Sequence, residues 1–189
     1  MTGAEKRKGD KASQATSKEA AQQQYLRFKV YNDVKSGGKI FVFGNLALLQ
    51  APLLGLLCSR ECPGHVLLKT LDRVPEWVRA GGVIVSGFHS PLEQQVLRSV
   101  LRRSGRVVKV LARGMTECRP QPEERERLTA GQMLVITACP QEVRRTTRET
   151  ALARNRLVLD LATEIVAPHV TTGSPLAALL SERKLRDGI

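Results

Sequence analysis

Aromatic residues are scarce in this chain. One Trp, two Tyr and four Phe make up 4% of its 189 residues. Proteins that hold single strands of nucleic acid by base stacking interleave aromatic with basic side chains, so this is a poor sequence for that mode. Cysteine is also sparse, because four residues are too few for a disulfide-stabilised scaffold. The core must therefore be built from aliphatic side chains.

Long apolar runs are missing as well. The longest one, Leu46 to Cys58, is interrupted by Gln50, Pro52 and Gly55 and is too short to cross a bilayer. The N-terminus is polar throughout, so no secretory signal peptide is expected. We therefore expect a cytoplasmic protein that does not associate with membranes.

Positive charge is in excess. Lys and Arg total 30 against 18 Asp and Glu, a formal net charge of +12. Of the 30 basic residues, 20 are arginine, whose planar guanidinium suits phosphate oxygens. Hydrophobic residues reach 42%, which is enough for a folded core. The first expectation is a folded basic protein with an acidic partner.

The chain divides into a tail and one domain. Residues 1–24 contain no Leu, Ile, Val or aromatic residue, so they cannot bury enough surface to offset the entropy of ordering. We expect a disordered, basic and polar tail there, followed by a single domain over residues 25–189. Most of the net charge belongs to the domain.

From Lys39 onward, short apolar runs alternate with segments of helical spacing. The clearest helix start is Ser90-Pro91-Leu92-Glu93, which combines an N-cap, a proline at the first helical position and a capping box. Strands separated by helices require crossover connections and pair in parallel. We therefore predict an α/β fold: a doubly wound, mostly parallel, Rossmann-like sheet with helices on both faces. The expected strands are 40–43, 53–58, 83–86, 106–111, 132–137 and 164–168, and the expected helices are 66–80, 90–104, 122–130, 144–161 and one from 174.

Ligands of such sheets bind outside the carboxyl ends of the strands. The loops expected there carry hydroxyls, glycines and an arginine, groups that bind phosphate. The candidate residues are Ser59 and Arg60 after one strand, Ser86 and Gly87 after the next, and Thr172, Gly173 and Ser174 before the last helix. Each loop alone is a weak signal, and three at one edge of a sheet are a stronger one.

Arg154-Asn155-Arg156 is the sharpest signal. Arg144, Arg145 and Arg148 precede it. These three either line the same edge of the sheet or form a solvated helix face.

The order of these motifs resembles the DNA-processing protein A (DprA/Smf) family over roughly residues 39–180. The matching segments are Phe41 to Leu46, Leu54 to Arg60, Ser86-Gly87, Val110 to Met115, Arg154-Asn155-Arg156 and Thr172-Gly173-Ser174. Cys58 replaces a glycine of the family pattern. The resemblance suggests a stand-alone, diverged Rossmann-like core without the winged-helix domain of many family members.

The resemblance implies single-stranded DNA binding without sequence preference, in DNA uptake or recombination. Ser59 and Arg60 would hold a DNA phosphate, with Ser86 and Gly87 lining the same pocket. Arg154, Asn155 and Arg156 would flank the pocket, and Thr172, Gly173 and Ser174 would close it. It also implies a homodimer and a RecA-type recombinase as a partner.

Other functions compete with this one. The same loops suit a sensor or enzyme domain that binds a free nucleotide or a nucleotide-derived ligand, and a basic surface also suits a scaffold for an acidic protein. No nucleophile can be placed beside His89, so we expect no enzyme activity. The spacing of Cys58, Cys62 and His65 is not that of a zinc site, so no metal or cofactor is expected. If Cys58 lies at a helix N-terminus near Arg60, its thiol pKa should be lowered.

Overall fold

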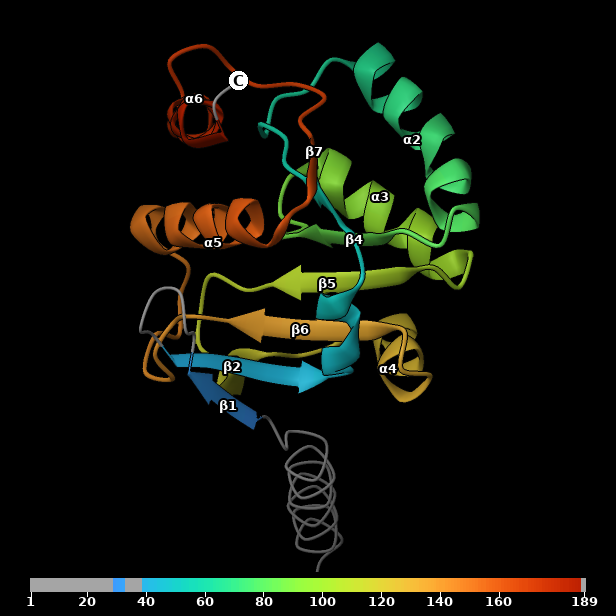
Figure 1. Ribbon diagram of the computed structural model, residues 1–189, viewed down its shortest axis with the longest axis vertical. Helices are drawn as coiled ribbons and strands as arrows, with labels where there is room; N and C mark the ends of the chain where they lie inside the picture. Colours follow the sequence, from blue (N-terminus) through green and yellow to red (C-terminus); the bar gives the residue numbers. More distant parts are fainter. Residues whose placement is uncertain (1–28, 33–38, 188–189) are drawn as a thin grey trace, which may run out of the picture.

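The computed structural model describes residues 29–32 and 39–187. A seven-stranded sheet lies between layers of helices (Figure 1). Its strands are β1 (Lys29–Asn32), β2 (Lys39–Gly44), β3 (Leu53–Leu56), β4 (Val83–Ser86), β5 (Arg106–Val110), β6 (Met133–Thr137) and β7 (Glu164–Val166). The strand order is β1-β2-β6-β5-β4-β3-β7.

The sheet is parallel except at one edge. Strands β6, β5, β4, β3 and β7 pair in parallel, because helices or long connections return the chain to the same end of the sheet each time. Strand β2 pairs antiparallel with β6, and β1 pairs antiparallel with β2. The predicted doubly wound, mostly parallel fold is confirmed, whereas β1 and the antiparallel edge were not predicted.

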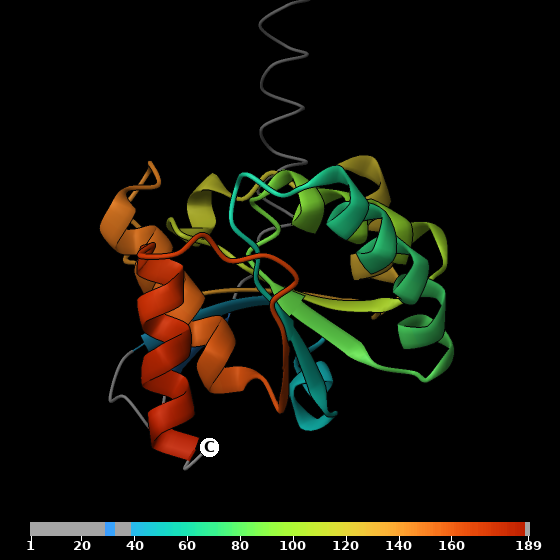
Figure 2. The same ribbon diagram turned by 90° about the horizontal axis from the view of Figure 1, so that it is seen from above.

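Helices cover both faces of the sheet (Figure 2). One face carries α2 (Gly64–Arg79), α3 (Pro91–Arg102) and α4 (Pro122–Thr129), with the 3-10 turn η2 (Met115–Glu117) on the same side. The other face carries α5 (Arg148–Leu161), α6 (Pro175–Asp187) and the 3-10 turn η1 (Leu46–Gln50).

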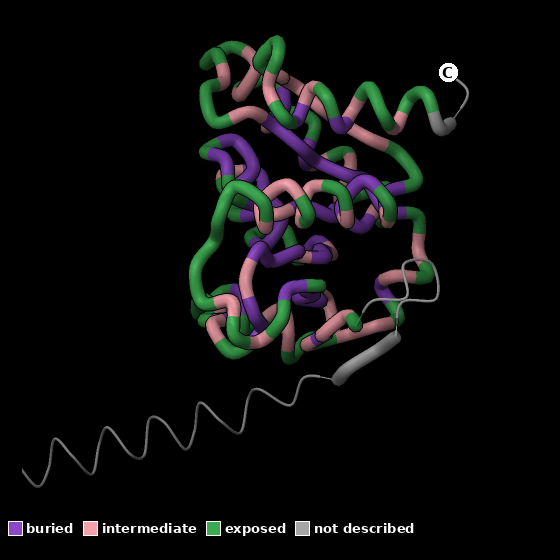
Figure 3. Tube along the Cα trace, turned by 90° about the vertical axis from the view of Figure 1, so that its left-hand side faces the viewer, coloured by how far each residue is buried: buried purple, intermediate pink, exposed green. Residues whose placement is uncertain are grey.

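Each face has its own aliphatic core. Alternate residues of a strand point to opposite faces, so Ile84 joins the core under α3 while Val83 and Val85 join the core under α5. Strands β3, β4 and β6 are buried along their whole length, as strands covered on both faces should be. Figure 3 shows the buried segments inside the molecule and the exposed ones around its periphery.

One helix begins later than expected. The helix predicted from residue 144 begins at Arg148, because Thr147 caps it: the Thr147 Oγ1 accepts the Thr150 N–H at 3.2 Å. The predicted tail, residues 1–24, lies outside the described residues, and its boundary stays a prediction. Within the described part of the chain, no helix is both long enough and apolar enough to cross a membrane.

Candidate functional site

The loops at the carboxyl edge of the parallel strands enclose a pocket of about 360 Å³. Five of the residues predicted from the sequence line this pocket together: Ser59, Arg60, Arg154, Asn155 and Ser174. The other residues that line the pocket are polar or charged side chains and small to medium-sized apolar ones. These are Cys58, His89, Ser90, Glu93, Thr146, Thr147, Arg148, Ala151, Leu152, Pro175 and Leu176.

The first turns of three helices border the pocket. Ser90 begins α3, Thr147 and Arg148 begin α5, and Ser174 begins α6. The Ser174 Oγ accepts the N–H of Ala177 at 3.2 Å. Because the N-terminus of a helix carries partial positive charge and unpaired N–H groups, this convergence favours an anion.

Glu93 is the one carboxylate that lines the pocket, and its oxygens accept hydrogen bonds from backbone N–H groups of two loops. Its side chain is 3% exposed. Oε1 accepts the N–H of Cys58 at 2.9 Å, and Oε2 accepts those of His89 at 2.8 Å and Ser90 at 3.3 Å. Glu93 therefore ties the loop after β3 to the loop after β4 and sets the shape of the pocket floor.

Arg60 and His89 meet across the mouth of the pocket, with Arg60 Nη2 3.3 Å from His89 Nε2. A guanidinium only donates hydrogen bonds, so the histidine Nε2 is the acceptor and its ring is neutral. Burial lowers the pKa of His89 below its ordinary value of 6.5, and the positive charges of Arg154 and Arg60 lower it further, against an opposing effect of Glu93. An anion placed here would neutralise this positive potential.

Arg154 is held over the loop after β4. Its Nε and Nη2 both donate to Asn155 Oδ1, at 3.1 and 2.8 Å. The side chain passes so close to Gly87 that a Cβ at that position would lie 2.5 Å from Nε and 2.6 Å from Cδ. Burial lowers the pKa of Arg154, the Glu93 carboxylate raises it, and Arg60 lowers it. Gly87 thus makes room for the arginine rather than lining the pocket itself.

Ser59 links two loops. Its N–H donates to the His169 carbonyl at 3.0 Å, and its Oγ accepts the Thr171 N–H at 2.9 Å. No described residue accepts the hydroxyl proton of Ser59, which leaves it able to donate to a phosphate oxygen. Arg60, Arg148 and Arg154 add positive charge, and none of them forms an ion pair with a carboxylate of the described residues.

Besides Gly87, two further predicted contacts need correction. Ser86 is fully buried, and its Oγ accepts the Phe88 N–H at 3.0 Å, so it shapes the turn and does not line the pocket. Arg156 points elsewhere, since its Nη2 lies 3.2 Å from Glu182 Oε2 of α6. Residues two apart on a helix do not share a face, so Arg154 and Arg156 cannot both enter one pocket.

Only part of the loop before α6 lines the pocket. Thr172 and Gly173 are exposed and do not line the pocket, whereas the adjacent Ser174 does. Gly173 has φ +70°, a left-handed conformation that turns the chain into α6. Thr172 and Gly173 remain predicted contacts for a ligand larger than the pocket.

Arg148 lines the pocket, which agrees with the first of the two alternatives left open for Arg144, Arg145 and Arg148, and neither Arg144 nor Arg145 lines it. The sequence does contain a signal for it, because Thr147 and Thr150 have the spacing of a capping box and the structure forms one. Recognising that cap would have placed Arg148 in the first turn of α5, at the edge where the other loops meet. Glu93 was recognised as a capping residue, but its bonds to Cys58 and His89 depend on tertiary structure.

The expectation for Cys58 is wrong. Burial raises the pKa of its thiol to about 12, with Cys62 and Glu93 adding to the effect and the His169 backbone opposing it. The structure therefore makes Cys58 an unreactive part of the core. All four cysteines are free thiols, and no three metal-ligating side chains of the described residues form a group.

The fold has relatives among solved structures. DNA processing protein A from Helicobacter pylori, described for its single-stranded DNA binding mode, aligns at 18% identity and a TM-score of 0.68, over 85% of this chain and 79% of that one. The corresponding protein from Streptococcus pneumoniae aligns at 20% identity and 0.68, over 90% of this chain and 64% of its own. A molybdenum cofactor-binding protein from Rippkaea orientalis aligns at 11% identity and 0.51, over 72% of each chain.

At these identities the solved structures establish a shared fold. No curated protein sequence matches the chain. The family model for DNA recombination-mediator protein A, in contrast, matches residues 29–181. That segment contains the whole sheet and every residue that lines the pocket, and so the chain belongs to the DNA recombination-mediator protein A family.

Proposed function

We propose that this chain binds single-stranded DNA through the phosphate backbone, without sequence preference. One observation carries the proposal: the first turns of α3, α5 and α6 converge with Arg60, Arg148 and Arg154 on one pocket. The pocket's carboxylate, Glu93, is occupied by backbone N–H groups. A phosphate therefore meets several donors, and the lining holds three arginines against a single carboxylate.

The composition of the pocket favours phosphate over base recognition. No Phe, Tyr or Trp side chain is among the residues that line it, so it offers no aromatic platform for a stacked base. Contacts limited to phosphate and sugar carry no direct sequence information. A polynucleotide also uses basic residues outside a single pocket, which a free nucleotide does not.

The chemistry of the pocket supports a binding protein and not an enzyme. The oxygens of Glu93 are taken by three backbone N–H groups, and His89 accepts from Arg60. Among the described residues, neither side chain hydrogen-bonds to a hydroxyl or a thiol. The free cysteines agree with action in the cytoplasm, where thiols stay reduced. The homodimer and the RecA-type recombinase partner implied by the family resemblance stay predictions.

The test is fluorescence anisotropy with single-stranded DNA, duplex DNA and mononucleotides at two salt concentrations. We expect the single strand to bind tightest and its affinity to fall steeply with salt, because bound phosphates release counterions. Arg60→Ala should cost on the order of 1–3 kcal/mol of binding free energy. Lys184→Ala, on the opposite face from α3, is the control. Equal or tighter binding of mononucleotides would favour the alternative, a nucleotide sensor.

A further inference from the structure

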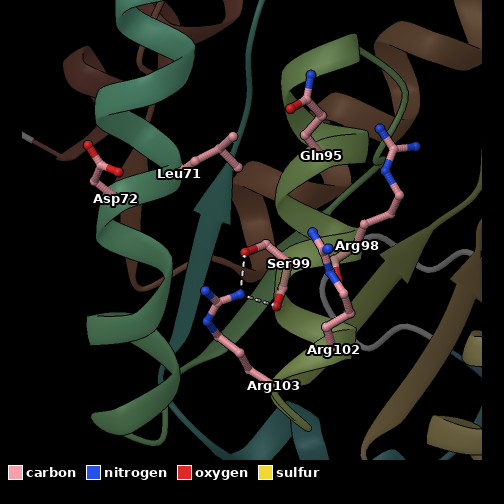
Figure 4. Close-up of a pocket in the computed structure, with 7 residues that line it drawn as sticks. All are labelled: Leu71, Asp72, Gln95, Arg98, Ser99, Arg102 and Arg103. Carbon is pink, nitrogen blue, oxygen red and sulfur yellow. Dashed lines mark hydrogen bonds between the residues drawn. The ribbon is translucent and has the colours of Figure 1, made fainter.

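A second basic groove lies between α2 and α3, on the face of the sheet away from α5 and α6. It has a volume of about 650 Å³ and is lined by Leu71, Asp72, Gln95, Arg98, Ser99, Arg102 and Arg103 (Figure 4). None of these residues belongs to the pocket at the carboxyl edge of the sheet. Three arginines in one groove call for an explanation that the first pocket does not provide.

The arginines are only partly engaged by the protein. Arg103 Nη1 donates to the carbonyl and hydroxyl of Ser99, at 3.1 and 2.8 Å, and Arg102 Nε donates to the Arg98 carbonyl at 3.3 Å. These bonds use a minority of the five N–H donors on each guanidinium. None of the three forms an ion pair with a carboxylate of the described residues. Asp72 is the one carboxylate that lines the groove, so three arginines stand against a single negative charge (Figure 4).

Helix α3 connects this groove to the first pocket. Its N-cap, Ser90, lines the pocket, while Arg98 and Arg102 lie further along the same helix. At 1.5 Å per residue, Arg98 is about 12 Å along the axis from Ser90, and Arg102 is about 6 Å further. Arg98 and Arg102, four residues apart, lie on one face of the helix and form a short line of charge.

We propose that the α2–α3 groove holds the backbone of the same DNA strand after it leaves the pocket. The inference rests on the proposed function and extends it to a second contact region. The lining favours a flexible polyanion over a protein partner, because Leu71 is its one apolar side chain and protein interfaces depend on buried apolar or aromatic anchors. Binding should then depend on strand length.

The test compares oligothymidylates of about 2 and about 30 nucleotides, because at about 3.4 Å or more per nucleotide a strand of about six would already reach from Ser90 to Arg98. A long strand offers more positions at which the pocket can bind, and this alone raises its apparent affinity. Wild-type protein should bind the long strand more tightly than this statistical effect predicts. Arg98→Gln/Arg102→Gln should remove this gain, on the order of tenfold at low salt, and leave the short strand unaffected. The salt slope for the long strand should fall by about 1.4, since each phosphate contact on a single strand contributes about 0.7.

The control is Arg79→Gln/Lys184→Gln, which removes two exposed positive charges outside the groove. The match is close, because Arg79 Nε donates to its own helix at 3.3 Å as Arg102 does. Melting temperatures check that both variants fold, and Arg98→Lys/Arg102→Lys should keep most of the gain. The inference fails if Arg98→Gln/Arg102→Gln and Arg79→Gln/Lys184→Gln weaken binding of the long strand equally. It also fails if Arg98→Gln/Arg102→Gln keeps the full affinity gain of the long strand. If wild-type protein binds neither strand, the proposed function fails first.

Discussion

Gly87 lies directly beneath the side chain of Arg154, so close that a Cβ on it would come within 2.5 Å of the guanidinium Nε. The contact joins the loop after β4 to the second turn of α5, and a side chain at position 87 would take the space that Arg154 occupies. A glycine that the sequence predicts to line the pocket instead positions Arg154, the residue that we propose contacts the DNA.

Gly87→Ala should therefore displace Arg154 and leave the fold intact. We expect single-stranded DNA affinity to fall by about 1–2 kcal/mol, the net value of a charge-assisted hydrogen bond. Anisotropy titration measures this, with a melting curve to confirm folding. Gly64→Ala is the matched control, because a Cβ there meets nothing within 4 Å. Wild-type affinity in the Gly87 variant would mean that Arg154 does not contact DNA.

Binding should tighten as pH falls. Burial, Arg154 and Arg60 lower the pKa of His89 in the free protein, so the ring is neutral at pH 7. A bound phosphate favours the protonated ring and raises that pKa, and proton uptake on binding strengthens affinity as pH decreases. We expect affinity to rise as pH falls from 8 through the raised pKa of His89 in the complex, and to level off once pH is below the lowered pKa of His89 in the free protein.

His89→Gln should flatten this dependence, whereas His65→Gln, an exposed histidine on α2, should not. Titrations at constant ionic strength across that range make the comparison. Identical pH profiles for wild-type protein and His89→Gln would show that no phosphate binds near this ring.

Cys58 should resist alkylation at neutral pH. Its pKa of about 12 leaves almost no thiolate, and the side chain is buried. Mass spectrometry after brief iodoacetamide treatment should find Cys62, the less buried neighbour, labelled first. Faster labelling of Cys58 than of Cys62 would contradict the burial of Cys58 and the raised pKa of its thiol.

Glu93→Gln should destabilise the protein. The amide replaces one acceptor oxygen with an NH₂ group that faces backbone N–H donors, in a site only 3% exposed. We expect a loss of about 2–4 kcal/mol in the free energy of unfolding, measured by urea denaturation. Glu182→Gln, at an exposed ion pair, should cost less than about 1 kcal/mol. Comparable losses would mean that Glu93 does not organise the loops.

Local chemistry explains which parts of the fold were predictable. The bounds of β4 agree with the prediction because its apolar run is short, continuous and followed by turn residues. The cap of α3 agrees because Ser90, Pro91 and Glu93 define it within four positions. The antiparallel edge was missed because β2 pairs with β6, about 90 residues away, and nothing local indicates that pairing.

The candidate site was also predictable where local chemistry decides and not where tertiary structure does. Ser59, Arg60 and Arg154 were predicted because strand ends and helix starts of a parallel sheet meet at one edge. Arg156 was grouped with Arg154 by adjacency in the motif, although helical geometry directs it to Glu182. The state of Cys58 depends on Glu93, 35 positions along the chain, and on burial that only the folded chain reveals.

The two arginines of the Arg-Asn-Arg motif supply the most direct test. Arg154 lines the pocket and Arg156 pairs with Glu182, although they are nearly adjacent in sequence and carry the same charge. Salt titrations of single-stranded DNA binding should show that Arg154→Gln weakens affinity on the order of tenfold and lowers the salt slope by about 0.7. Arg156→Gln should stay within about twofold of wild type, the effect of an exposed charge. Equal losses in the two variants, or none in Arg154→Gln, would contradict phosphate binding in this pocket.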